Sequence, residues 1–400
     1  MTLTRSISGD PPQERRRAAR APVFVNAHGY HVELLDHRRI AIHRDEWLNL
    51  ACRSIEPNIF FDPDFLLPAA RFLSGDLPTF VVIRRVVDGR MKLVGLCPIS
   101  ERDMRSGRRM VRIWRHPYTA LGVPLFDRRW FKGAFDAMLD WLAHAGRSAL
   151  IFADLRIDHP FARMLLHRAR RIGSRISTFD VHERPVLHTG GAAIRSTNTQ
   201  RAIARNFSKL KKLGKIEFRA ARSVEELIGA FLTFLSLEEQ GWKGRRGTAL
   251  AEEEGTARFA LTAVHALAKR RSCYVWELRH CDQTIVTVVA FGQPDNLVCW
   301  KTAFDEKFAR FSPGLLLMAS VTDAWLTDPA FAFADSCAAG GANTTVARLW
   351  NDRVRIGDVL VAVSPRRYDF RIADAHERVR RSMRRAAKVA YHAFVHPGRK

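Results

Sequence analysis

The sequence has no hydrophobic run long enough to cross a membrane. A spanning helix needs about 20 consecutive apolar residues, and no stretch of the 400 residues approaches that length. Residues 1–21 are polar and rich in arginine, without the apolar segment that a secretory signal carries. The sequence therefore predicts a cytoplasmic protein, and we interpret residues 1–21 as a disordered basic arm.

Cysteine is also scarce. The six cysteines are scattered, without a CxxC pair or a histidine at metal-ligand spacing, and several lie in apolar, strand-like runs. This pattern is typical of reduced, buried thiols. We therefore expect neither disulfides nor a metal site.

Acidic residues are too few to balance the basic ones. Asp and Glu number 41 against 65 Lys and Arg, which gives a net charge of +24 and favours an anionic partner. Residues 201–215 hold six Lys or Arg and no acid, and residues 366–400 hold eleven against three acids. Apolar residues recur at helical spacing in both, such as Ile203, Phe207 and Leu210 in the first. We interpret both as cationic amphipathic helices, with a solvated face on a docked helix as the alternative.

The elements of the first half are predicted from hydrophobic periodicity and turn residues. They are a strand at 32–36, helices at 43–53 and 62–74, strands at 79–87, 92–99 and 109–115, a helix at 130–144, a strand at 149–154, a helix at 161–171 and an extended segment at 174–187.

The second half repeats this order after a linker at 189–199 and the basic helix. Its elements are a strand at 216–220, helices at 224–240 and 252–270, strands at 273–278, 284–291 and 297–304, a helix at 315–326, a strand at 330–335, a short helix at 345–350 and a strand at 358–363. A repeated order indicates duplication of one domain type. We predict an α+β fold of two tandem domains, 22–190 and 191–365, each a mixed central sheet flanked by helices, followed by the basic helix 366–400.

A helix start in the second half has the residues of an anion site. The run is Phe311-Ser312-Pro313-Gly314-Leu315-Leu316. Ser312 is a good N-cap, Pro313 suits the first turn, and Gly314 allows close approach to the backbone. Because the first turn leaves N–H groups unpaired at the positive end of the helix dipole, a pyrophosphate would suit it.

This element order, with a phosphate-ready turn after its fourth strand, resembles the GNAT acyltransferase fold. In that family the backbone N–H groups of the turn hold the coenzyme A pyrophosphate, and the neighbouring strand offers backbone donors to the thioester carbonyl. The resemblance implies that residues 311–316, together with Trp300, Lys301 and Thr302, bind acetyl-CoA or another acyl-CoA.

Four runs in the second half look like the CelD/BcsL-type acetyltransferases, which are assigned to cellulose or exopolysaccharide biosynthesis. The runs are EEQGWKG at 238–244, WKTAFD at 300–305, FSPGLL at 311–316 and DSCA at 335–338. The sequence resemblance covers about residues 197–363, whereas the first half resembles the family only in its topology. The tandem architecture is also similar to the Fem-type peptidyltransferases, which use aminoacyl-tRNA.

Acyl transfer to an amine or hydroxyl needs a base for the nucleophile. Glu238 ends a predicted helix just before a turn, and burial beside Trp242 would raise its pKa to a useful value. A solvated carboxylate at the helix end is the alternative for Glu238, and Glu239 is the neighbouring candidate. Asp305, at a strand end, is a weaker candidate that more often forms a turn.

The remaining candidates would contact the acceptor or supply a proton. Trp242, Lys243 and Asp335 are candidates for binding the acceptor, since Asp335 ends a strand where open α/β sheets place ligand groups. No tyrosine lies between Tyr274 and Tyr368 to protonate the leaving thiolate. The general acid is therefore Ser336, Cys337, a water molecule or a residue of the first half.

The matching junction of the first half, residues 116–124, is longer and has no glycine at a helix start. We expect this copy to shape the acceptor cleft instead of seating a cofactor. The prediction is an acyl-CoA-dependent acyltransferase acting on an amino or hydroxyl group of a sugar-derived acceptor. The alternatives are a Fem-type transferase that binds tRNA, and a scaffold docked on anionic membrane through 366–400, a helix that would then contribute little to the fold.

Overall fold

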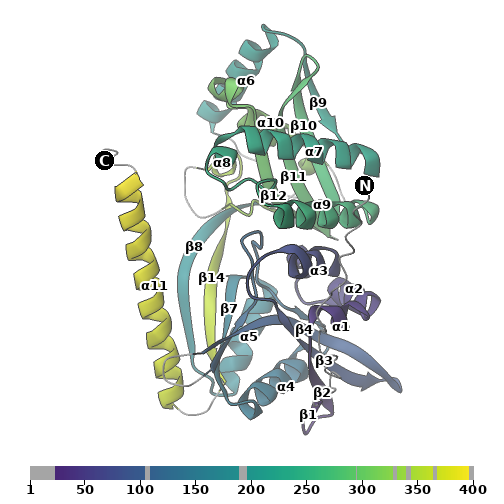
Figure 1. Cartoon of the computed structure of the whole chain (residues 1–400), viewed down its shortest axis with the longest axis vertical. Helices are drawn as coiled ribbons and strands as arrows, with labels where there is room; N and C mark the ends of the chain where they lie inside the picture. Colours follow the sequence, from purple (N-terminus) through teal and green to yellow (C-terminus); the bar gives the residue numbers. More distant parts are fainter. Residues whose placement is uncertain are drawn as a thin grey trace, which may run out of the picture.

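The computed structural model describes residues 23–103, 109–188, 196–293, 295–327, 331–338, 344–363 and 367–395. The predicted basic arm at 1–21, most of the linker at 189–199 and the last five residues lie outside the described residues. Figure 1 shows the first half below, the second half above it and the final helix along one side.

The first half has the predicted elements in the predicted order, with four short additions: β1, α1, η1 and β6. Two to five residues give too little periodicity to be seen in a sequence. The strands are β1 (Phe24–Val25), β2 (Tyr30–Leu35), β3 (Thr79–Val87), β4 (Arg90–Asp103), β5 (Arg109–Ile113), β6 (Leu125–Phe126), β7 (Arg147–Arg156) and β8 (Ile176–His188). The helices are α1 (His37–Ala41), α2 (Arg44–Arg53), the 3₁₀ turn η1 (Ile59–Phe61), α3 (Pro63–Phe72), α4 (Phe131–His144) and α5 (Pro160–Arg171).

The second half also follows the prediction, and its additions are the short helix α8 and the 3₁₀ helix η2. Its strands are β9 (Ile216–Ala220), β10 (Cys273–His280), β11 (Gln283–Gln293), β12 (Asn296–Phe304), β13 (Phe333–Asp335) and β14 (Asp352–Ala362). Its helices are α6 (Thr197–Lys211), α7 (Val224–Gln240), α8 (Trp242–Arg245), α9 (Glu254–Lys269), η2 (Glu306–Phe311), α10 (Pro313–Thr327), η3 (Val346–Arg348) and α11 (Arg367–Val395).

The predicted mixed sheet flanked by helices is confirmed, but the two halves share it. The described strands form one 14-stranded sheet in the order β1-β2-β3-β4-β5-β7-β14-β8-β13-β12-β11-β10-β9, with β6 beside β4. The halves join where the end of β8 pairs antiparallel with β13, through Leu187 and Ala334 among others. Two pairs are parallel, β5 with β7 and β12 with β13. Each half thus keeps the same strand arrangement within a continuous sheet.

The last strand is not where its sequence position suggests. We expected it to complete the second half, but β14 lies between β7 and β8 in the first half, antiparallel to both. Its side chains are buried on both faces of that sheet: Val359 and Val361 in the main core, Leu360 in a smaller core beneath α11. Periodicity identifies a strand but not its neighbours, because a strand buried on both faces would fit either half equally well.

Aromatic side chains fill the contact between α3 of the first half and the second half. Phe65 lies 5.2 Å from Phe259, 5.6 Å from Phe291 and 5.9 Å from Trp300, measured between ring centroids. Beside this cluster Arg270 bonds Asp62 and Asp64 of the first half at 2.8 Å each. The two halves are therefore held together by an apolar contact with charged groups at its margin.

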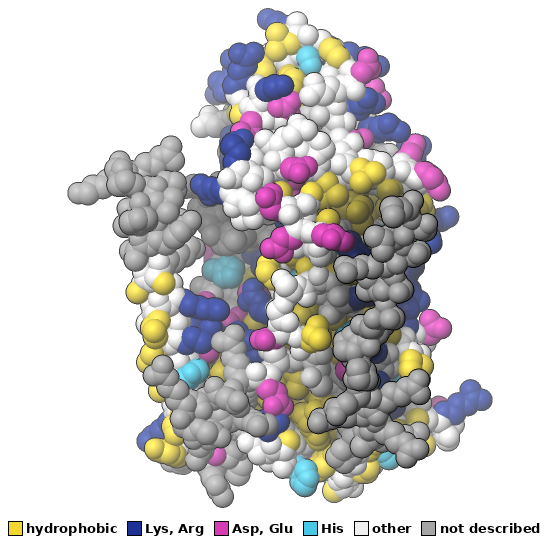
Figure 2. All heavy atoms as spheres, viewed as in Figure 1, with side chains coloured by type: hydrophobic (Ala, Val, Ile, Leu, Met, Phe, Trp, Pro, Cys, Tyr) yellow, Lys and Arg dark blue, Asp and Glu magenta, His cyan; other side chains and the backbone are white. Residues whose placement is uncertain are grey.

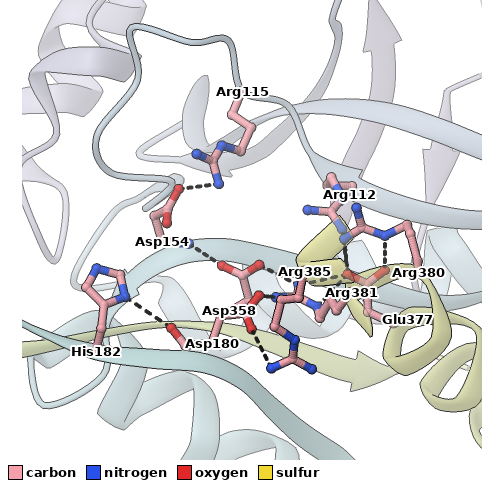
Figure 3. A network of polar contacts seen from close by, with 10 residues as sticks. All are labelled: Arg112, Arg115, Asp154, Asp180, His182, Asp358, Glu377, Arg380, Arg381 and Arg385. Carbon is pink, nitrogen blue, oxygen red and sulfur yellow. Dashed lines mark hydrogen bonds and ion pairs between the residues drawn. The ribbon is translucent and has the colours of Figure 1, made fainter. Parts of the chain in front are cut away.

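The helix α11 is docked on the first half, so the expectation that 366–400 contributes little to the fold is wrong. Phe370 and Ala373 are buried in the small core with β7 and β14. Further along, Glu377 is fully buried and accepts hydrogen bonds from Arg112 of β5 (2.9 Å) and from Arg381 (2.8 Å). Figure 3 shows this cluster. None of the described helices is both long and apolar enough to cross a membrane.

Replacing Glu377 should destabilise the protein strongly. Burial raises the pKa of this carboxyl, but Arg380, Arg112 and Arg381 outweigh it and hold the pKa at about 2. Because the pKa is lowered in the folded state, this stabilisation is present above the unfolded value of 4.5 and disappears as the pH falls toward 2. Glu377→Ala removes the buried carboxylate that Arg112, Arg380 and Arg381 share, and we expect a loss of about 3–5 kcal/mol in the free energy of unfolding at neutral pH.

The control is Arg378→Ala on the same helix, which removes an exposed pair with Asp374 and should cost under about 1 kcal/mol. Urea unfolding at pH 7 measures both variants. Equal losses for the two would contradict a buried docking contact.

Candidate functional site

The start of α10 is a sharp turn open to solvent. Ser312 stands at the predicted N-cap position, but its backbone is left-handed (φ 53°, ψ 56°) instead of extended. Its carbonyl accepts the N–H groups of Leu315 (2.9 Å) and Leu316 (3.2 Å). Above Gly314 the space is empty: an added Cβ would meet nothing within 4 Å. The backbone of Gly314 is therefore accessible to a ligand, whereas the side chains of Phe311, Leu315 and Leu316 are buried in the core, as is Pro313.

The basic helix α6 supports this turn. Its predicted apolar face is confirmed, since Leu210 is buried in the second-half core with Ile203 and Phe207 packed against it. Asn206 is also buried, and its side-chain N–H donates to the Phe311 carbonyl at 3.1 Å. The basic side chains of α6 are exposed around this support: Arg201, Arg205, Lys209 and Lys211. In Figure 2, Lys and Arg side chains gather over this part of the molecule. A phosphate at the turn would lie in a positive field.

The strand β12 is irregular beside the turn. Its pairing with β11 shifts between Cys299 and Lys301, so Trp300 sits in a bulge without an opposite residue. On its other edge, β13 pairs with β12 only from Asn296 to Val298. Beyond Val298, that edge has no neighbouring strand in the part of the chain that the structure describes. Its backbone groups can therefore face a ligand.

A cavity of about 300 Å³ lies between the halves next to this bulge. The second half contributes Trp300, Lys301 and Cys337 to its wall. The first half contributes the loop after β5, the end of β7 and the middle of β8, through Arg115, Pro117, Tyr118, Thr119, Ala120, Asp154, His182 and Arg184. Both halves are therefore needed to form this cleft.

Glu238 is buried, but its pKa moves opposite to our expectation. The carboxylate is 2% exposed. Oε1 lies 2.7 Å from the Lys243 ammonium and 3.4 Å from that of Lys301, and Oε2 accepts the Leu250 N–H at 2.8 Å. Burial raises the pKa, but the charge of Lys301 and the contact with Lys243 outweigh it, so that the pKa is lowered. Trp242, the neighbour expected to desolvate Glu238, is 46% exposed. A carboxylate held in this way is a weak base.

Lys301 is the charged group that connects Glu238 with the cleft. Its ammonium lies 5.2 Å from the centre of the Tyr118 ring, and burial lowers its pKa although Glu238 partly opposes that effect. Next in the strand, Thr302 borders a smaller pocket with Glu238, Trp242 and Lys243 on the side of α8. The cleft therefore has a cation in its second-half wall, held in place by a buried carboxylate.

Asp335 is enclosed and does not face the cleft. It is fully buried; Arg156 binds it through Nε at 3.0 Å, and its other oxygen accepts the Cys337 N–H at 2.8 Å. Arg184, which does line the cleft, lies 3.6 Å from it. Asp335 therefore supports Arg184 and the turn at Cys337. Ser336 is also buried, with its hydroxyl accepting the Ala338 N–H, whereas Cys337 lines the cleft.

Asp305 forms a turn, which was the alternative to its role as a base. Its carboxylate accepts the Lys307 N–H at 2.9 Å, which caps η2, and a hydrogen bond from Gln283 at 3.2 Å. The equivalent junction of the first half is filled by its own loop. An added Cβ on Gly122 would lie 2.1 Å from the Ala153 carbonyl oxygen, so the loop packs directly on β7.

The comparisons with known proteins agree with this geometry. Residues 197–331 match the family model described as the acetyltransferase (GNAT) domain. The chain has a GNAT-like acyltransferase fold. The matched segment includes the β12 bulge and the Ser312–Gly314 turn. No curated protein matches the sequence significantly.

Solved structures resemble the chain across both halves. One is the C-terminal domain of a protein described as a lysylphosphatidylglycerol synthetase, from Agrobacterium fabrum, with a TM-score of 0.53 and 10% identity over 84% of this chain and 96% of that one. FemX has a TM-score of 0.51 and 10% identity over 78% and 95%. A tandem GNAT protein from the clavulanic acid biosynthesis pathway reaches 0.40, with 12% identity over 84% and 99%. At these identities the likeness concerns the fold alone.

Residues 116–124, which we expected to shape a cleft, line it through Pro117, Tyr118, Thr119 and Ala120, but sequence reasoning missed the charged residues of the first-half side. Arg115, Asp154, His182 and Arg184 come from three separate elements and form no motif in the sequence. A weak signal exists for Asp154, since it follows a strongly apolar strand run. Asn206 was also missed, because a polar residue on the face of a basic helix looks like part of its solvated side.

Glu238→Gln should lower the pKa of Lys301. Glu238 now opposes the effect of burial on this ammonium, and glutamine carries no charge. Titration of the Lys301 ¹³Cε signal by NMR measures the change. Glu239→Gln, at the exposed neighbouring position, is the matched control and should leave the titration unchanged. A Lys301 titration that is the same in all three proteins would show that the two groups are not coupled.

Proposed function

We propose that the protein is an acyl-CoA-dependent acyltransferase. The donor would bind the second half at the Ser312–Gly314 turn, and the acceptor would enter the cleft between the halves. The observation that carries the proposal is the open backbone at Gly314 next to the β12 bulge, within the segment that matches the GNAT domain.

The residues around the turn fit the pyrophosphate of coenzyme A. A side chain at position 314 would occupy space that is empty here, and the helix that supports the turn, α6, carries exposed cations. Asn206 holds the Phe311 carbonyl, which fixes the direction of the turn. When bound, acyl-CoA would supply an activated carbonyl beside the edge of β12.

The chain would then contribute positioning and charge. In this scheme the Trp300 bulge offers backbone donors to the oxyanion, and the Lys301 ammonium adds a positive charge near it. Glu238 holds Lys301 in place, a positioning role that its contacts favour over the general-base role suggested by the sequence. Cys337 lines the cleft, and burial strongly raises its pKa, so that it stays a neutral thiol that can donate a hydrogen bond to the leaving thiolate but is too weak an acid to protonate it. The proton that the thiolate takes up is then the one that the amine or hydroxyl of the acceptor loses.

The finer identity rests on the four runs that resemble the CelD/BcsL-type acetyltransferases. On that ground we propose acetyl-CoA as the donor and a sugar-derived amine or alcohol, linked to exopolysaccharide or cellulose synthesis, as the acceptor. The reaction would take place in the cytoplasm.

Aminoacyl transfer from tRNA is the second candidate. It is favoured by the two-half likeness to FemX and by the net charge of +24. Two measurements distinguish transfer from tRNA from transfer from acyl-CoA. They are filter binding of tRNA at several salt concentrations and calorimetry with coenzyme A. Tight tRNA binding without coenzyme A binding would favour the second.

Gly314→Val should weaken coenzyme A binding at least tenfold, about 1.4 kcal/mol. The β-branched side chain would fill the space that the pyrophosphate needs above the backbone. Isothermal titration calorimetry measures the affinity. Gly229→Val is the control, because Gly229 on α7 also has open space around it but lies outside the turn. Equal affinities of wild type and Gly314→Val would place the anion site elsewhere.

The outer face of α11 remains a proposed contact for anionic membrane. Val379 (59% exposed) and Met383 (68%) lie one turn apart among arginines, and Figure 2 shows hydrophobic side chains along this edge. Glutamate at both positions should reduce pelleting with vesicles that contain phosphatidylglycerol, because it removes apolar contact and adds negative charge. Ile42→Glu, an equally exposed site away from α11, should have no effect. Unchanged pelleting of the double variant would exclude this face.

A further inference from the structure

A second cavity adjoins the cleft on the side away from β12. It has a volume of about 390 Å³ and lies between α11, β5 and the loops that follow α3 and β5. It shares Arg115 and Pro117 with the cleft, so the two spaces meet at these residues. We call it the arginine cavity, after four of its lining residues: Arg112, Arg115, Arg380 and Arg384.

The charge of this cavity suits an anion. Asp76 is the one carboxylate among its lining residues in the described part of the chain. Glu377 binds Arg112 and Arg380 from behind, and Asp154 binds Arg115. These contacts orient the guanidinium groups, as Figure 3 shows for Arg112, Arg115 and Arg380. Planar guanidinium groups with several N–H donors recognise phosphate oxygens well.

A buried histidine in the cavity wall adds a hydrogen-bond donor. His116 is 6% exposed and lines the cavity, and its Nδ1 accepts the Tyr118 N–H at 3.4 Å. Burial, together with the charge of Arg115, lowers its pKa to about 3, so the ring is neutral. With Nδ1 as the acceptor, the hydrogen lies on Nε2, which has no partner within the described residues. An unpaired buried N–H is unfavourable unless a ligand accepts from it.

We propose that the arginine cavity binds a phosphate group of the acceptor. This inference rests on the proposed function and means that the acceptor is a phosphorylated compound. Its phosphate lies among Arg115, His116 and Arg384. The rest of the molecule extends past Pro117 toward Lys301. The shared residues Arg115 and Pro117 place the two cavities next to each other, and two adjacent cavities of this size suit a small molecule better than a polymer.

The test uses the full chain with two probes, glucose 1-phosphate and inorganic phosphate. The readout is the ¹⁵Nε2 signal of His116, which reports the cavity directly and needs no acyl transfer. Both probes should shift this signal. Glucose 1-phosphate should bind at least threefold more tightly, since its sugar reaches the adjoining cleft. Arg384→Gln should weaken both at least tenfold while coenzyme A affinity stays unchanged.

Arg385→Gln is the matched control. It removes the same charge from the next position of α11, where the side chain faces Asp180 instead of the cavity (Figure 3). This variant should bind both probes as wild type does. An equal loss in Arg384→Gln and Arg385→Gln would mean general charge attraction and overturn the site.

Other outcomes also decide the matter. A His116 signal that neither probe moves overturns the proposal, and equal affinity for the two probes overturns its acceptor part. Competition by tRNA alone, without a response to the small phosphates, would assign the cavity to nucleic acid instead. If coenzyme A fails to bind the wild type while glucose 1-phosphate binds the cavity, the donor assignment fails and this site stands. If instead coenzyme A binds the wild type and glucose 1-phosphate does not bind the cavity, the phosphate site is overturned and the donor assignment stands.

Discussion

The structure depends on the joint at the end of β8, where one strand bonds to partners from both halves. Its last residues pair with β13, and the residues before them pair with β14. Directly beneath, the fully buried Arg156 joins Glu56 of the first half (3.1 Å) to Asp335 of the second (3.0 Å). Buried ions of opposite sign are favourable only in good geometry. The two halves therefore have a defined orientation, and the cleft a defined width.

This joint explains how residues far apart in the sequence can line one cleft. Arg184 on β8 and Cys337 after β13 flank the joint, and both line the cleft. Asp335 contacts each of them without reaching the cavity itself. The loop after β5, which fills the corresponding opening of the first half, supplies the opposite wall. The second half thus has an open turn at the start of α10, whereas the loop of the first half fills the corresponding opening and forms a wall of the cleft.

The pKa values of the buried carboxylates depend more on their ion pairs than on their burial. Burial alone would make Glu238 a stronger base, but two lysines within 3.4 Å reverse the direction of its pKa shift. The same applies to Glu377, which is fully buried and still has a pKa of about 2 because three arginines surround it. His116 is the opposite case, since it is buried next to a cation and stays neutral.

The sequence by itself determined most of the elements. The periodicity of 224–240 predicts α7, the β-rich run at 297–304 predicts β12, and Ser312-Pro313-Gly314 predicts the start of α10, because these signals are local. The repeated order also predicted the fold class. Only the tertiary structure decided that β14 crosses into the first half, that α11 is docked, and that Arg184 and Lys301 share a cleft. Those outcomes depend on which buried surfaces and charges meet across long separations in the chain, and local spacing carries no information about such partners.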